Sequence, residues 1–232
     1  RVRNFESDLS DTRVTLDSVL APVGVRRLLG KVTGLDVASR TVTYGFDGVQ
    51  QPIGYDRLVF ALGSRLAWPP IPGLAKYGFD VDTYDAAMRL NGHIVRLGSG
   101  ASTVLVVGGG LTGIEAAAEM PDKLRAAGVA SPRVILADHA PRIGSNMGAE
   151  AVPVIEEALQ ALGVEMRGGV SVASVDATGA TLQDGERIEA ATVVWCAGMR
   201  AHSLTAAFPV ERDRLGRLPR GRLTAQPEIR AL

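Results

Sequence analysis

The chain has 232 residues with 25 basic and 25 acidic side chains, so its formal net charge at pH 7 is zero. Its 46% hydrophobic and 22% charged residues are typical of a soluble globular protein with one or two domains, and the charge balance excludes an electrostatic basis for nucleic-acid binding. Because Cys196 is the single cysteine and no apolar run approaches the roughly 20 residues of a membrane helix, we expect a cytoplasmic protein without a disulfide framework.

Short strands are predicted in the first third of the chain. Lys31 to Asp36, Arg40 to Tyr44 and Tyr55 to Ala61 form a predicted β-meander, with turn formers such as Asp47-Gly48 between them. The segment from Trp68 to Gly73 contains three prolines, which lack backbone donors, so it is predicted to be a linker or a rigid surface loop.

From Ser102 onward, strands alternate with helices, which predicts a parallel sheet with right-handed crossovers. A first helix is expected to end at Met120, because Pro121 should break or kink it before a second helical stretch. The other predicted elements, in chain order, are a strand Thr103 to Val107, a strand Arg133 to Asp138, a helix from about Ala149 to Leu162, a strand Val164 to Arg167, a hairpin Val170 to Leu182 and a strand Thr192 to Ala197.

A glycine motif lies where the first of these strands ends and its helix begins. It consists of Gly108, Gly109, Gly110, Leu111, Thr112 and Gly113. In a dinucleotide-binding motif, Gly108 permits a tight turn, Gly110 lets the backbone approach a pyrophosphate, and Gly113 allows the helix to pack closely on the strand. The alternative is a turn with a purely structural role, but the strand-turn-helix setting favours dinucleotide binding.

Asp138 supports this interpretation because it stands at the end of the second strand, 25 residues after Gly113. An acidic side chain there accepts hydrogen bonds from the adenosine ribose and repels a 2′-phosphate, which favours NADH over NADPH. A solvated strand-end carboxylate is the alternative. Arg142 weighs against the preference for NADH, since an arginine nearby could meet a 2′-phosphate.

Four stretches of the chain resemble one known family in the same order. Tyr55 to Ser64 resembles its YDxLVxATGS strand, Ile71 to Gly73 its IPG, Gly108 to Glu115 its NAD fingerprint, and Val193 to Gly198 its WxAG strand. The family is that of the two-dinucleotide-binding FAD/NAD(P)-dependent pyridine nucleotide oxidoreductases, in particular its type II NADH dehydrogenase-like members.

The resemblance implies an α/β fold in which a Rossmann-like NAD-binding domain, with a parallel sheet and a β-meander, is inserted in a partial FAD-binding domain. Residues 1–98 would belong to the FAD-binding domain, 99–205 would form the NAD(H)-binding domain, and 206–232 would return to the FAD-binding domain. The chain would then be a central fragment, colourless and inactive by itself. The segments of the family that lie outside this chain would carry the FAD pyrophosphate motif, any homodimer surface and any peripheral membrane contact.

The resemblance also implies which residues contact the cofactors. Glu115 would bond the nicotinamide side of the dinucleotide, Ala197 and Gly198 would lie beside the nicotinamide half, and Ala61 and Gly63 would lie near the flavin. A carboxylate near a helix N-terminus also simply favours the helix dipole, which is the alternative for Glu115. Leu62 departs from the family, because a threonine is usual there.

The activity implied is transfer of a hydride from NADH to FAD and of electrons to a quinone or another small acceptor, with the chemistry supplied by the cofactors. No catalytic side chain or metal site is predicted. Trp195 is expected to be core packing, Cys196 a buried inert thiol, and the three histidines, His93, His139 and His202, surface residues. The competing function is a module that binds or senses NAD(H) without turnover. A dithiol reductase would need a CxxC pair that these residues lack.

Overall fold

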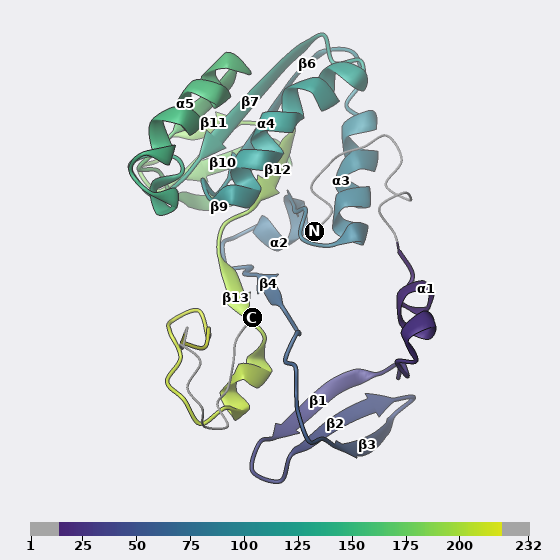
Figure 1. Cartoon of the computed structure of the whole chain (residues 1–232). Coiled ribbons are helices and arrows are strands. Elements are labelled where there is room, and N and C mark those ends of the chain that lie inside the picture. Colours follow the sequence, from purple (N-terminus) through teal and green to yellow (C-terminus); the bar gives the residue numbers. More distant parts are fainter. Residues whose placement is uncertain (1–13, 220–232) are drawn as a thin grey trace. The chain divides into compact units, whose positions relative to one another are not determined.

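The computed structural model describes residues 14–219, which group into two compact units. The larger unit comprises residues 66–198, and the smaller comprises residues 14–65 together with 199–219. Figure 1 labels most of the helices and strands of both units. The predicted boundaries between the FAD-binding and NAD(H)-binding domains, at residues 98 and 205, stay a prediction, because the two units are defined by contacts and not by the cofactor that each binds.

A five-stranded parallel sheet forms the centre of the larger unit, in the order β5-β12-β6-β7-β8. The predicted α/β fold with a parallel sheet is therefore confirmed. The strands are β5 (Gly78–Phe79), β6 (Ala101–Val107), β7 (Ser131–Ala137), β8 (Val164–Arg167) and β12 (Thr192–Trp195).

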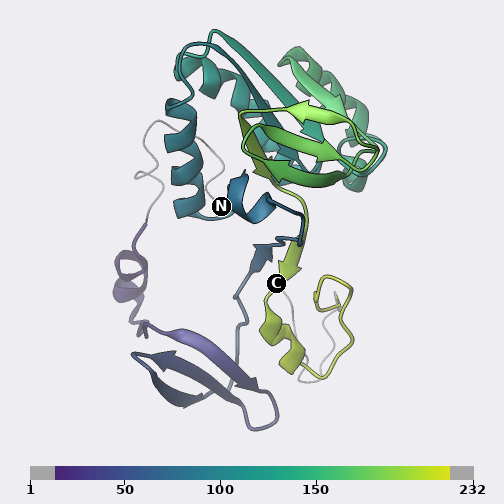
Figure 2. The ribbon, with the colours of Figure 1, turned by 180° about the vertical axis from the view of Figure 1, so that it is seen from behind.

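Each face of this sheet is covered by its own layer. One face packs against α3 (Tyr84–Val95), α4 (Leu111–Ala126) and α5 (Ala151–Ala161). The other face packs against an antiparallel sheet of β9 (Val172–Asp176), β10 (Gly179–Leu182) and β11 (Arg187–Glu189). Figure 2, which turns the ribbon by 180°, shows this sheet. The predicted hairpin therefore has a third strand. Two short helical segments, α2 (Leu74–Tyr77) and a 3-10 turn (Ser145–Met147), complete the unit.

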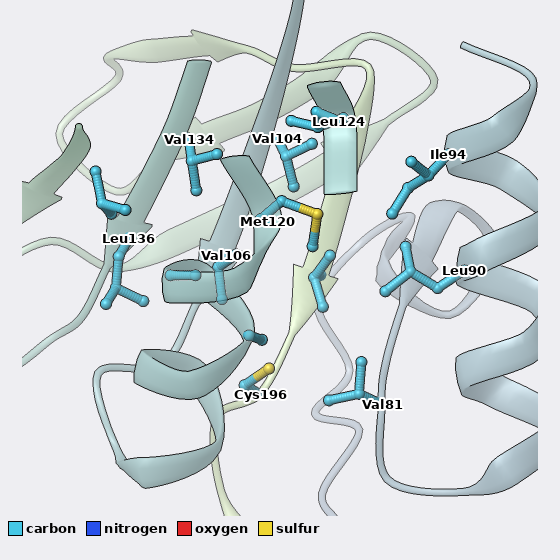
Figure 3. Close-up of a cluster of buried hydrophobic side chains, with 14 of the residues drawn as sticks. Val81, Leu90, Ile94, Val104, Val106, Met120, Leu124, Val134, Leu136 and Cys196 are labelled. Atoms are coloured by element: carbon cyan, nitrogen blue, oxygen red, sulfur yellow. The ribbon is translucent and has the colours of Figure 1, made fainter. Parts of the chain in front are cut away.

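The alternation of side chains along β6 explains why this strand is apolar throughout. Val104 and Val106 point into the helical layer, whereas Leu105 and Val107 belong to the cluster on the opposite face. Figure 3 shows Val104 and Val106 on the side of Met120 and other residues from the helices. A parallel strand buried on both faces requires such a continuous apolar run.

The expected break at Pro121 is wrong, because α4 runs without interruption from Leu111 to Ala126. A proline inside a helix costs about 3 kcal/mol. Met120 and Leu124 are fully buried in the helical layer, and burying each such side chain contributes roughly 1.5 to 3 kcal/mol. Packing against the sheet therefore outweighs the local cost of the proline.

Helix α3 was not predicted from the sequence, although its signals are present. The side chain of Thr83 caps the helix by accepting from the Ala86 backbone N–H, and Leu90 and Ile94 are buried at helical spacing. His93 on this helix is half-buried, so its prediction as a surface residue is wrong. Its ring stacks on Phe79 with centroids 4.5 Å apart, and its Nε2 lies 2.9 Å from Thr192 Oγ1.

The smaller unit contains an antiparallel sheet of β1 (Lys31–Asp36), β2 (Thr41–Phe46) and β3 (Val49–Gly54). Asp47 and Gly48 join β2 to β3 with φ of 49° and 78°, the positive values of a type I′ hairpin turn. Its other elements are α1 (Leu16–Leu20), a 3-10 turn (Ala21–Val23), the paired strands β4 (Ser64–Leu66) and β13 (Met199–Ala201), and a 3-10 turn (Ser203–Ala207).

The meander was predicted with a wrong third strand. Tyr55 to Ala61 is irregular, and the chain already supplies the third strand as β3. Val59 is 71% exposed, and no strand of the described region pairs with this segment. An extended apolar segment becomes a strand only when a neighbour completes its hydrogen-bond ladder.

Within residues 14–219, no helix is both long and apolar enough to cross a membrane.

The environment of His93 predicts a loss of stability in mild acid. Burial lowers the pKa of His93 from 6.5, the bond to the Ala191 carbonyl opposes this, and the charges of Arg96 and Arg89 lower it further. Folding therefore favours the neutral ring, and the stabilisation present above pH 6.5 is lost as the pH falls below that value. We expect the free energy of unfolding, measured by urea titration, to fall as the pH drops below about 6.5.

This fall should be smaller in His93→Gln, since a neutral amide can still donate to the Ala191 carbonyl. His139→Gln is the control, because the His139 side chain is exposed. Equal acid sensitivity in the wild type and His93→Gln would contradict the assignment to His93.

Candidate dinucleotide-binding site

The predicted site residues of the larger unit meet at the carboxyl edge of its parallel sheet (Figure 1). The glycine loop joins β6 to α4, Asp138 follows β7, and Ala197 and Gly198 follow β12. Because β6 lies between β7 and β12, the sheet brings these three loops together. Open α/β sheets bind their ligands at this edge.

Gly108 makes the turn out of β6 with φ of 118°. A Cβ atom at this position would lie 2.7 Å from the backbone nitrogen of Ala197. The Gly108 N–H also donates to the Ala137 carbonyl at 2.8 Å. The glycine loop therefore lies between the ends of β7 and β12, with no room for a side chain.

Gly113 in the first turn of α4 brings the helix against the glycine loop. A Cβ atom there would lie 1.8 Å from the carbonyl oxygen of Gly108, closer than any real contact, and 3.4 Å from the Cβ of Cys196. The close helix-strand packing predicted for Gly113 is confirmed by this geometry.

Gly110 differs from the other two glycines because the space beside it is open. It is the N-cap of α4, no side chain caps the helix there, and the nearest atom to a Cβ would be Asn146 Nδ2 at 3.8 Å. Leu111 next to it is exposed, and Glu115 one turn further is half-buried. The loop thus presents helix N–H groups to an open space, which suits an anion.

Asp138 is ordered by backbone donors and is not a solvated strand-end carboxylate. Its side chain is 12% exposed. Its Oδ2 accepts from the Gly109 N–H at 2.5 Å, and its Oδ1 accepts from the Ala140 N–H at 2.7 Å. Each carboxylate oxygen has a second lone pair, so the group can still accept from a hydroxyl.

Arg142 is engaged by a carboxylate of α5. Its Nε and Nη2 bond the two carboxylate oxygens of Glu156 at 3.0 and 2.5 Å. The hydrogen bond from Arg142 lowers the pKa of Glu156, so the pair is charged at neutral pH. A two-pronged contact of this kind holds the guanidinium in a fixed orientation.

Trp195, the last residue of β12, and Cys196, which follows it, have structural roles. Trp195 is buried in the core and donates from Nε1 to the Ala67 carbonyl at 3.0 Å, as expected for core packing. Burial, aided by the charges of Asp80 and Asp82, raises the pKa of the Cys196 thiol to about 12. Cys196 is therefore an inert thiol, as predicted, since the reactive form is the thiolate.

The two predicted flavin-side residues belong to the smaller unit. Ala61 and Gly63 are exposed and lie in irregular structure before β4. Gly63 has φ of 68°, and no atom lies within 4 Å of the position of its Cβ.

Within the described residues, no group of three or more histidine, cysteine, aspartate or glutamate side chains could hold a metal ion.

Sequence reasoning missed Asn146, whose amide lies beside the glycine loop. No motif marks this residue, because its position depends on how the loop after β7 folds back over Gly109. Its neighbour Gly144 donates from its N–H to the Gly109 carbonyl at 2.9 Å.

Comparisons with known proteins identify the family of the chain. The family model for the pyridine nucleotide-disulphide oxidoreductases matches residues 7–226. Over 228 residues the chain is 54% identical to an NADH dehydrogenase-like protein of Mycobacterium tuberculosis, with 94% of the chain and 56% of the relative covered. Over 222 residues it is 32% identical to a type II NADH:quinone oxidoreductase of the same organism, with 84% and 48% covered.

Among solved structures, a ferredoxin reductase from Rhodopseudomonas palustris superposes with a TM-score of 0.72 at 22% identity, covering 87% of this chain and 48% of the other. The chain thus spans about half the length of the curated relatives it matches. Because the family model matches nearly the whole chain, the chain belongs to the pyridine nucleotide-disulphide oxidoreductase family.

Proposed function

We propose that this chain is the NAD(H)-binding part of a flavin-dependent NADH oxidoreductase, which passes a hydride from NADH to FAD and electrons to a quinone or another small acceptor. The names of its relatives, NADH dehydrogenase-like protein and type II NADH:quinone oxidoreductase, support this activity. The observation that carries the proposal is the glycine loop, which is closed by backbone at Gly108 and Gly113 and open at Gly110.

The glycine loop fits the pyrophosphate of a dinucleotide. The open space at Gly110 would receive the phosphates, which the first N–H groups of α4 and the positive end of its dipole stabilise. Ala197 and Gly198 follow the adjacent strand β12 at the same edge of the sheet, where the nicotinamide half would lie.

The charges around the expected ribose site support NADH over NADPH. The Asp138 carboxylate is held in place by two backbone N–H groups and would repel a 2′-phosphate. Arg142, which could have attracted that phosphate, has its charge balanced by Glu156.

FAD would be held partly by residues of the smaller unit. The exposed backbone at Gly63, which has open space beside its Cα, suits close approach of a flat ring, and Ala61 precedes it. When bound, FAD would supply the redox chemistry, namely transfer of a hydride from NADH and of electrons to the acceptor. The residues of this chain contribute binding and orientation. The single cysteine is buried, so the chain supplies no dithiol of its own.

Gly110→Val should abolish NADH binding and leave the fold intact. The backbone at Gly110 has φ of −82°, which any residue adopts, and the space beside it is open. The added side chain would therefore occupy the place of the pyrophosphate without a clash in the free protein. Titration calorimetry measures NADH affinity, and thermal denaturation reports the fold.

Gly100→Val is the matched control, since this exposed glycine has no atom within 4 Å of its Cβ position and lies at the opposite end of β6. It should bind NADH as the wild type does. Unchanged NADH affinity in a folded Gly110→Val protein would mean that the glycine loop is only a turn.

Asp138→Asn should reduce the preference for NADH over NADPH. The amide keeps the size of the side chain and one acceptor oxygen but loses the charge that opposes a 2′-phosphate. We expect the ratio of the two dissociation constants to fall by about tenfold or more, as loss of a contact between charged groups is worth roughly 1.5 to 3 kcal/mol.

The control for Asp138→Asn is Asp184→Asn, which also alters a carboxylate that accepts from a backbone N–H, but in the turn before β11. A preference that is the same in the wild type, Asp138→Asn and Asp184→Asn would contradict the ribose assignment.

Turnover separates an oxidoreductase from a module that only binds NAD(H). We propose that turnover needs the segments of the relatives that this chain does not span, so the chain alone should bind NADH without oxidising it. The complete gene product should contain FAD and oxidise NADH with a soluble quinone, measured by the loss of NADH absorbance. A complete product that binds NADH but neither holds flavin nor oxidises NADH would instead be a binding module.

A further inference from the structure

The loop after β7 is fastened to the glycine loop by hydrogen bonds in both directions. The Gly109 N–H donates to the Asp138 carboxylate at 2.5 Å, and the Gly109 carbonyl accepts from the Gly144 N–H at 2.9 Å. The side chain of Ile143 also packs here, with its Cδ1 3.0 Å from the place of a Cβ at Gly109. The two loops therefore form one connected structure.

This connection fixes the position of the 3-10 turn Ser145–Met147. Gly144 begins the turn with φ of 72°, and the Met147 N–H donates to the Gly144 carbonyl at 2.8 Å. The Ser145 hydroxyl donates to the Arg142 carbonyl. Asn146 is thereby held on the outside of the turn, with its side chain exposed and its Nδ2 3.8 Å from the place of a Cβ at Gly110.

The amide of Asn146 has no hydrogen-bond partner within the described part of the chain. It nevertheless lies on a turn that backbone bonds hold in place, beside the one glycine of the motif with open space next to it. An amide at this place can donate a hydrogen bond to an acceptor that enters the space at Gly110.

We propose that Asn146 is a further binding residue for the dinucleotide and donates an Nδ2–H hydrogen bond to an oxygen of its pyrophosphate. This inference rests on the proposed function, because it needs a pyrophosphate at Gly110. Asn146 lies beside the N-cap residue of α4, with its Nδ2 3.8 Å from the place of a Cβ at Gly110. As a neutral donor, it binds a phosphate oxygen without adding a charge near Asp138.

The inference predicts which fragments of the dinucleotide respond to a change at position 146. Asn146→Ala should weaken binding of ADP and of NADH by about tenfold, the value typical of one hydrogen bond to a charged group. Asn146→Asp should weaken both further, because it places a negative charge beside the phosphates. Binding of adenosine, which has no phosphate, should be equal in the wild type and in both variants. Calorimetry measures all three ligands.

Asn91→Ala and Asn91→Asp are the matched controls, because they make the same changes on α3, away from the glycine loop. They should bind ADP as the wild type does. Thermal denaturation of every variant reports whether the fold is retained.

The outcomes separate the two proposals. If ADP binds equally to the wild type, Asn146→Ala and Asn146→Asp, while Gly110→Val abolishes binding, the role of Asn146 is refuted and the proposed function stands. If adenosine binding falls as much as ADP binding, Asn146 acts through the shape of the site and the inference is also refuted. If the wild type binds neither NADH nor ADP, the proposed function itself fails.

Discussion

The contact between Gly113 and the carbonyl of Gly108 is the constraint on which the rest of the site depends. No other residue fits at position 113, because a Cβ would lie 1.8 Å from a backbone oxygen that the turn out of β6 holds in place. A glycine inside a helix costs roughly 1 kcal/mol relative to alanine. In return, α4 begins directly over the glycine loop, with its first N–H groups beside the open space at Gly110. The same placement directs Met120 and Leu124 into the core, so the site and the packing of the helix share one geometric cause.

Around this contact, the site is organised mainly by backbone groups. The carbonyl of Ala137 fixes Gly108, the carbonyl of Gly109 fixes the loop after β7, and the Asp138 carboxylate joins both loops. Such bonds have little freedom to rearrange, so the loops do not have to become ordered when a ligand arrives. The parallel sheet beneath them is buried on both faces, which keeps the ends of its strands in register.

Sequence reasoning succeeded where local chemistry determines structure. The roles of Gly108 and Gly113 follow from a turn and a close approach that only glycine permits, and the alternation of strands and helices follows from the period of the apolar residues. It failed where distant contacts decide. Pro121 is tolerated because the buried face of α4 compensates for it, Tyr55 to Ala61 is irregular because no strand pairs with it, and His93 is drawn inward by Phe79 and Thr192. Asn146 carries no local signal at all, since its position comes from bonds between two loops.

Distant contacts also determine which charges remain unbalanced near the proposed ribose site. In the sequence, Asp138 and Arg142 favour opposite cofactors. The Asp138 carboxylate repels a 2′-phosphate, whereas the Arg142 guanidinium, four positions later, attracts it. The structure gives each a different partner. Asp138 accepts hydrogen bonds from the backbone N–H groups of Gly109 and Ala140, and the exposed His139 ring lies beside it, with its Nδ1 3.3 Å from Oδ1. Glu156, from a helix that begins nine residues after Arg142, balances the positive charge of the arginine. In the proposed site, the side chain that would select between the cofactors is therefore the carboxylate. Selectivity would then depend on Glu156 of α5 as well as on the residues of the motif, which explains why the motif alone left the choice of NADH or NADPH open.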